Sequence, residues 1–283
     1  MRFTRSPFGN AVNLFFLLLL SLLMAIPMVY TVSSAFKPMD ELFLFPPRLW
    51  VSNPTLANFW NLSGIMRDSW IPMSRYLMNS LLLTAIGVTG QVVFASMAAF
   101  VLSRETFHGK AFLNKVVMLS LMFSGSVTAV PNYFIMSRLG MINTHLSILL
   151  PAFCSSLGLF LKKQFMDQMI PYTVVEAARI DGANAWHQLW RIQLPNIWLV
   201  FSFVMFDCIR GTLQCFDIPF IMTNGGPGYA SSTFTLYTID TAFKYNSFGM
   251  AATMAVAIMA IVILVYVFQN VVLKKVFNQE EAA

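Results

Sequence analysis

The stretch EAARIDGANAWHQLWRIQLP (residues 176–195) carries most of the information in this chain. It is a polar interruption between two long apolar runs, and it is longer than a simple connection between two membrane helices needs to be. Pro171 can begin a short helix before it, because the first helical turn leaves that amide unpaired anyway, and Glu176 then lies near the positive end of the helix. We expect Gly182 to turn the chain into a second short helix, and Pro195 lies where the next apolar run begins.

The composition indicates a membrane protein. Hydrophobic residues make up 57% of the 283 residues and charged residues 11%, against about 25% charged in a typical soluble domain. Several apolar runs reach the roughly 20 residues that cross a bilayer. We predict six spans, at about 12–34, 76–102, 112–137, 145–162, 196–221 and 250–272. These runs are too long and unalternating for barrel strands, so the predicted fold is an all-α integral membrane protein.

Basic residues predict the orientation. With the N-terminus inside, the inner side receives eleven of them: Arg2, Arg5, Arg104, Lys110, Lys115, Lys162, Lys163, Arg179, Arg191, Lys274 and Lys275. The outer side receives six: Lys37, Arg48, Arg67, Arg75, Arg138 and Lys244. The positive-inside rule therefore places both termini and residues 171–195 in the cytoplasm. The first apolar run is longer than a signal-peptide core and lacks a clear cleavage site, so we predict a retained span.

The stretch 176–195 closely resembles the EAA loop of ABC-importer permease subunits. The matching residues are Glu176, Ala177, Ala178, Asp181, Gly182, Ala183, Ile192, Leu194 and Pro195. An ordinary amphipathic loop between helices would explain a helix here, but not the joint occurrence of these residues. In that family the loop forms a cytoplasmic coupling helix that docks into a cleft on the ATPase. The resemblance thus implies that residues 176–178 and 181–183 contact an ATPase, and that residues 1–283 form one permease domain.

The same resemblance implies the other parts of the assembly. They are a second homologous permease, two ATPase subunits and an extracytoplasmic solute-binding protein, in a bacterial or archaeal plasma membrane. No lysine followed by serine or threonine stands at P-loop spacing after the glycines of this chain. ATP and Mg would therefore be used by the ATPase subunits, while this chain would bind no cofactor and have no catalytic residue.

Two predicted outer segments contain turn-forming residues. Residues 34–59 hold Pro46-Pro47 and several aromatic residues but few charges, which indicates an ordered cap, although a generic proline-containing loop is the alternative. Residues 223–228 (TNGGPG) predict a tight turn. The first segment resembles the smaller permease type of maltose-permease-like sugar importers, and the second is more typical of the larger type.

Ionisable residues in the fifth predicted span mark a candidate translocation path. Asp207, Arg210, Gln214 and Asp217 are spaced by three, four and three residues, so on one continuous helix they share a narrow sector. Charges within a membrane normally face a bundle interior or a wet cavity, where such groups can exchange hydrogen bonds with a sugar. Phe203 could supply a ring face for stacking. The alternative is an internal Asp207–Arg210 ion pair against a partner helix.

These features together favour a permease subunit of an ATP-driven carbohydrate importer. Permeases for a polyol, a glycerol phosphoester or a peptide are close alternatives, and a secondary transporter that uses Asp207 and Asp217 for ions is a more distant one. No catalytic constellation supports an intramembrane enzyme. Neither a disulfide framework nor a metal site is expected from Cys154, Cys208, Cys215, His108, His145 and His187. Other polar span residues are expected to join helices: Gln91, Ser124 and Asn132.

Overall fold

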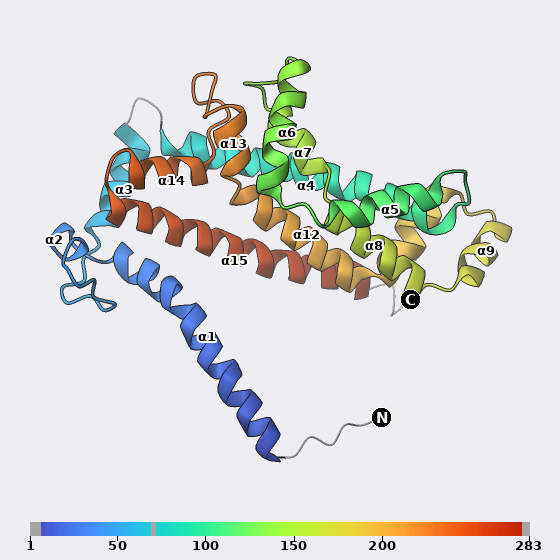
Figure 1. Cartoon of the computed structure of the whole chain (residues 1–283), viewed down its shortest axis with the longest axis horizontal. Coiled ribbons are helices and arrows are strands. Elements are labelled where there is room, and N and C mark those ends of the chain that lie inside the picture. The colour runs from blue at the N-terminus through green and yellow to red at the C-terminus, as the bar shows by residue number, and fades with distance from the viewer. Residues whose placement is uncertain (1–6, 69–71, 279–283) are drawn as a thin grey trace. The chain divides into compact units, whose positions relative to one another are not determined.

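A computed structural model describes residues 7–68 and 72–278, so Arg2 and Arg5 of the predicted inner side lie outside it. Within these residues all regular elements are helices (Figure 1). They are α1 (Pro7–Ala35), α2 (Met39–Leu42), α3 (Ala57–Asp68), α4 (Met73–Arg104), α5 (Lys110–Ser120), α6 (Gly125–Arg138), α7 (Leu146–Phe153), α8 (Ser156–Met169), α9 (Tyr172–Ile180), α10 (Ala185–His187), the π-helix η1 (Gln188–Gln193), α11 (Leu194–Asn196), α12 (Trp198–Leu213), α13 (Asp217–Met222), α14 (Phe234–Phe243) and α15 (Phe248–Asn278).

Several of these helices are long enough to cross a membrane. In the described part of the chain, four stretches have the necessary length and apolar composition: Gly9–Ala35, Met73–Arg104, Leu146–Met169 and Phe248–Val272. A bent pair, Ala185–Asn196 and Trp198–Leu213, meets at 92° and can make a fifth. The predicted all-α membrane protein is thus present as four or five apolar helical stretches. The predicted span 112–137 consists of α5 and α6, which are separated by residues 121–124.

The chain forms two compact units. The first comprises Met1–Pro72 with Thr238–Met259, and the second comprises Met73–Tyr237 with Ala260–Ala283. In the first unit, the amide of Asn58 donates to the carbonyls of Ala35 and Lys37 at 3.0 and 2.9 Å. The Glu41 carboxylate accepts from the backbone N–H groups of Ser52 and Asn53. Residues 35–58 are therefore held by side chain to backbone hydrogen bonds, in agreement with the predicted ordered cap.

The core of the second unit lies where α4, α8 and α12 pack together. Its buried cluster is Ala99, Phe100, Met166, Ile170, Val175, Leu189, Leu194, Ile197 and Phe201. Small residues let these helices approach closely. A Cβ atom added to Gly90 of α4 would lie 2.3 Å from the ring of Phe153, the last residue of α7. The helices α4 and α7 therefore approach each other closely at Gly90, where a larger residue would require the Phe153 ring to move.

Candidate functional site

The predicted loop begins with a short helix that ends in a defined glycine turn. Gly182 follows α9 with φ of +85°, a left-handed conformation that costs other residues energy. The N–H of Ala183 donates to the carbonyl of Ala178 at 2.9 Å, and the N–H of Gly182 donates to that of Arg179 at 3.1 Å. These two bonds form a Schellman motif. Gly182 is therefore required by the way in which α9 ends. The second short helix that was expected after Gly182 is present as α10.

The two faces of α9 have different surroundings. Val175 is 1% exposed and belongs to the core cluster of the second unit, and Ala178 is also buried. Ile180 is 83% exposed, and Glu176 and Ala177 on the same helix are exposed too. Asp181 and Gly182 are exposed, while Ala183 is half-buried. The helix is therefore anchored by one face and presents an isoleucine beside a carboxylate on the other.

The second half of the loop runs to Asn196 and meets α12 at a bend of 92°. The side chain of Asn184 accepts from the N–H of His187 at 2.8 Å and caps α10. Gln188 then donates from its side chain to the carbonyl of Ala183 at 2.7 Å. Leu189 and Leu194 are buried in the same core as Val175. The loop is consequently packed against the bundle; of its matching residues Leu194 is buried in the core, and Ile192 and Pro195 are half-buried.

The end of α4 contacts α8 and α9 through three consecutive residues, Ser103, Arg104 and Glu105, and the sequence gives no signal for these contacts. Ser103 donates to the Asp167 carboxylate of α8. The buried guanidinium of Arg104 donates to the backbone carbonyls of Met166 and Ile170, which end α8. Glu105 forms an ion pair with Arg179 of α9. A cation at a helix C-terminus is favourable because it pairs the free carbonyls there, and this arrangement ties α4, α8 and α9 together.

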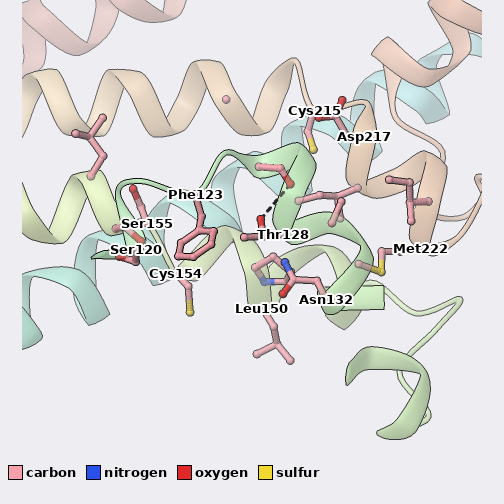
Figure 2. A pocket seen from close by; sticks show the side chains of 18 of the residues that line it. Ser120, Phe123, Thr128, Asn132, Leu150, Cys154, Ser155, Cys215, Asp217 and Met222 are labelled. Atoms are coloured by element: carbon pink, nitrogen blue, oxygen red, sulfur yellow. Dashed lines mark hydrogen bonds between the residues drawn. The ribbon is translucent and has the colours of Figure 1, made fainter. Parts of the chain in front are cut away.

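A second candidate site is a cavity of about 830 Å³ in the second unit. Three helix interruptions converge on it: residues 121–124 between α5 and α6, 154–155 between α7 and α8, and 214–216 between α12 and α13. We call it the helix-break cavity. Figure 2 shows Phe123, Cys154 and Asp217 around it, one side chain from each interruption or its edge. Its volume lies within the range of roughly 300–1,000 Å³ typical of ligand sites.

The predicted polar stripe is not on one helix, which corrects that expectation. Helix α12 ends at Leu213, and Asp217 begins α13. Gln214 and Asp217 line the helix-break cavity, whereas Asp207 lines a neighbouring cavity of about 260 Å³. The physical reason is that Gln214 leaves the helical conformation, so the 100° periodicity stops there.

Arg210 and Phe203 lie elsewhere. Arg210 pairs with the Asp207 carboxylate at 2.9 Å, so the ion pair of the alternative forms, but its side chains are 50% and 37% exposed and are not internal to this chain. Phe203 lines a separate groove of about 470 Å³, together with Phe206 and Tyr266. Gln214 and Asp217 therefore line the larger cavity, whereas Phe203, the residue expected to stack on a sugar, lines a different groove.

Several cavity residues were missed by the sequence argument. Thr128 and Asn132 of α6 line the cavity, although Asn132 was expected to join helices. Ser155 lines it too, and its side-chain oxygen accepts from the N–H of Gly158 at the start of α8. The available signal was the presence of serine and glycine inside apolar runs, at Ser124-Gly125 and at Ser155-Ser156, because such residues favour helix ends.

The chain resembles known transport proteins over most of its length. No family model matches it. It is 26% identical, over 265 residues, to the diacetylchitobiose uptake system permease protein of Streptomyces coelicolor, covering 90% of this chain and 83% of that protein. It is 28% identical, over 191 residues, to the sn-glycerol-3-phosphate transport system permease protein of Brucella suis, covering 67% of each.

A solved structure has the same fold. It is a bacterial ABC transporter involved in the import of the acidic polysaccharide alginate, and one of its chains matches with a TM-score of 0.75 and 18% identity, covering 95% of this chain and 99% of that one. The apolar helices are those of a helical membrane protein. The chain is thus similar in sequence to permease proteins of solute uptake systems and shares its fold with a chain of an ABC transporter.

Proposed function

We propose that this chain is one permease subunit of an ATP-driven importer for a carbohydrate, with the helix-break cavity as part of the solute path. The observation that carries the proposal is the convergence of three helix interruptions on a cavity with hydroxyl, amide and carboxylate groups. Irregular backbone at membrane depth is tolerated where it lines a wet cavity, and broken helices form many transporter sites. The names of the relatives, which transport diacetylchitobiose and sn-glycerol 3-phosphate, support a hydroxyl-rich solute.

The proposed topology has six crossings of the bacterial or archaeal plasma membrane and both termini in the cytoplasm. The spans are those predicted, at about 12–34, 76–102, 112–137, 145–162, 196–221 and 250–272. In this topology α5 with α6 makes the third crossing, and α12 with α13 makes the fifth. The excess of basic residues on the inner side supports it.

The exposed face of α9 is the proposed docking surface for an ATPase subunit. Ile180 next to Glu176 and Ala177 fits the recognition of a short helix by a groove, with an apolar anchor and a charged neighbour. Asp181, Gly182 and Ala183 shape the end of that helix. ATP and Mg are used by the ATPase in this proposal, and this chain binds neither. Residues 103–105 then carry movement of α9 to α4 and α8.

The proposed assembly contains a second homologous permease, two ATPase subunits and a solute-binding protein outside the membrane. Two docking loops are needed if a pair of ATPase subunits is to move both sides of the path together. The solved alginate transporter in complex with an alginate pentasaccharide-bound periplasmic protein matches this chain with a TM-score of 0.61, and it supports the binding-protein partner.

Cross-linking tests the docking assignment. The natural cysteines are replaced by serine, and Ile180→Cys is labelled with a thiol-linked photo-cross-linker in the co-expressed complex. We expect cross-links to the ATPase from this position, and none from Val175→Cys, which is 1% exposed on the same helix. The proposal fails if neither variant cross-links and the chain purifies without an ATPase. In that case uptake driven by an ion gradient would indicate the secondary transporter.

A further inference from the structure

The helix-break cavity has a simple charge pattern. Among the described residues that line it, Asp217 is the one charged side chain, and none is lysine, arginine or histidine. The neighbouring cavity likewise contains one carboxylate, Asp207, and no basic residue among its described lining. Figure 2 shows Asp217 beside Cys215, at the edge of the interruption that precedes α13. The described wall of the cavity therefore has a net negative charge.

The two carboxylates differ in their partners. Asp207 is neutralised by Arg210 at 2.9 Å. The Asp217 side chain has no hydrogen bond or ion pair within residues 7–68 and 72–278, and it is exposed to the cavity. Asp217 is thus an uncompensated charge, whereas the Asp207–Arg210 pair is close to neutral.

The guanidinium that could bind an anion is not available in the cavity. Arginine suits carboxylate and phosphate because its planar fork donates two hydrogen bonds to them. Arg210 lines neither cavity among the described residues and is already paired with Asp207. A phosphate or uronate in the helix-break cavity would consequently face Asp217 without a balancing cation from this chain.

The remaining polar groups suit an uncharged solute. The amides of Asn132 and Gln214 each offer donors and an acceptor. The Ser155 oxygen accepts from Gly158 N–H, which leaves its hydroxyl proton to donate. A saccharide hydroxyl both donates and accepts, so it can pair with all three side chains.

We propose that Asp217 is a specificity-determining residue that lets the helix-break cavity admit uncharged polyhydroxy solutes and repel anionic ones. The proposal rests on the proposed function, in which this cavity is part of the solute path. Repulsion between like charges is strong in a cavity with low-dielectric walls. The similarity of fold to an importer of an acidic polysaccharide does not oppose it, because a shared fold does not determine the solute.

Cys154 provides a direct probe of this charge, since it lines the cavity and is exposed. In the purified complex with its partner subunits, Cys208→Ser and Cys215→Ser leave Cys154 as the thiol of this chain. Its thiolate attacks a methanethiosulfonate, forms a mixed disulfide and releases methanesulfinate. The reaction rate is measured for a reagent with a trimethylammonium group and one with a sulfonate group, each relative to a small thiol in solution.

We expect the cationic reagent to react about tenfold faster than the anionic one, after this normalisation. Asp217→Asn should bring the ratio of the cationic to the anionic rate close to one, and Asp217→Glu should leave the parent ratio unchanged. Asp217→Glu is the matched control, because it keeps a carboxylate at the same position while changing the side chain. Equal rates in the parent protein, or a ratio that Asp217→Asn leaves unchanged, would overturn the proposal.

Transport gives a second, independent readout. Uptake of diacetylchitobiose, which is uncharged, is compared with uptake of sn-glycerol 3-phosphate in the same reconstituted complex, before and after Asp217→Asn. We expect the substitution to raise the ratio of anion to neutral uptake about tenfold. If the parent complex takes up no carbohydrate, the proposed function is wrong. The ratio of the two thiol reaction rates would still report the charge of the cavity.

Discussion

The carboxylate of Glu105 forms an ion pair with the guanidinium of Arg179, and so joins the segment after α4 to the last turn of α9. Its neighbour Arg104 is buried and holds the C-terminal carbonyls of α8. The proposed docking helix is therefore tied to two core helices through adjacent residues. Movement of α9 can reach α4 and α8 without passing through a flexible linker.

Charge reversal tests this connection. Glu105→Arg and Arg179→Glu should each lower solute transport per ATP hydrolysed, because two like charges then separate α9 from α4. The double variant should recover much of the loss. Both side chains are 42% exposed, so stability should change by only about 0.2–1 kcal/mol. Coupling and thermal unfolding are measured for all three variants. If both single variants transport as much solute per ATP hydrolysed as the parent, this ion pair has no role in coupling.

Gly182 should tolerate asparagine better than alanine. Its φ of +85° lies in the left-handed region, where most residues cost about 1–2 kcal/mol and asparagine costs less. Gly182→Ala should weaken co-purification of the ATPase, and Gly182→Pro should abolish it. Gly64→Ala in α3 is a control, because Gly64 has ordinary helical geometry and open space around it. A fully coupled Gly182→Pro variant would show that the turn is unnecessary.

Replacing Gly90 by a larger residue should destabilise the protein unless Phe153 is also replaced by a smaller residue. The added Cβ would meet the Phe153 ring at 2.3 Å, and such overpacking typically costs about 1–3 kcal/mol. Gly90→Ala should lower the unfolding temperature in detergent, and Phe153→Val in addition should restore part of it. The predicted packing of α4 on α7 is wrong if the single variant is as stable as the parent.

The proposed topology predicts opposite labelling of two positions. In a protein without its natural cysteines, Asn53→Cys should react with an impermeant thiol reagent in intact cells, and Ala177→Cys should react after the membrane is opened. Both positions are exposed in the structure, and the chain is expressed without the ATPase subunits so that the docking surface stays open to the reagent. Asn58 is less suitable, because its amide holds residues 35 and 37. Reversed labelling would place the docking loop outside and contradict the ATPase contact.

The sequence predicted the class of fold and the loop, but not the cavity. Apolar runs and the helix-turn-helix pattern around Gly182 are local, so composition and spacing are sufficient to find them. The cavity depends on three helix interruptions that meet only in the folded bundle. Gly211 lies near the end of α12 at Leu213, but a single glycine in an apolar run does not by itself predict a helix end. The roles of Arg104 and Glu105 also depend on tertiary contacts, which a single sequence does not reveal.

ATP-driven uptake tests the central claim most directly. The complex of this chain with its permease, ATPase and solute-binding partners is reconstituted in vesicles, with ATP on the ATPase side and ionophores that abolish ion gradients. A labelled carbohydrate supplied on the binding-protein side should accumulate, and Ile180→Asp on the exposed face of α9 should stop accumulation while the complex remains folded. Accumulation that needs an ion gradient and proceeds without ATP would contradict the account.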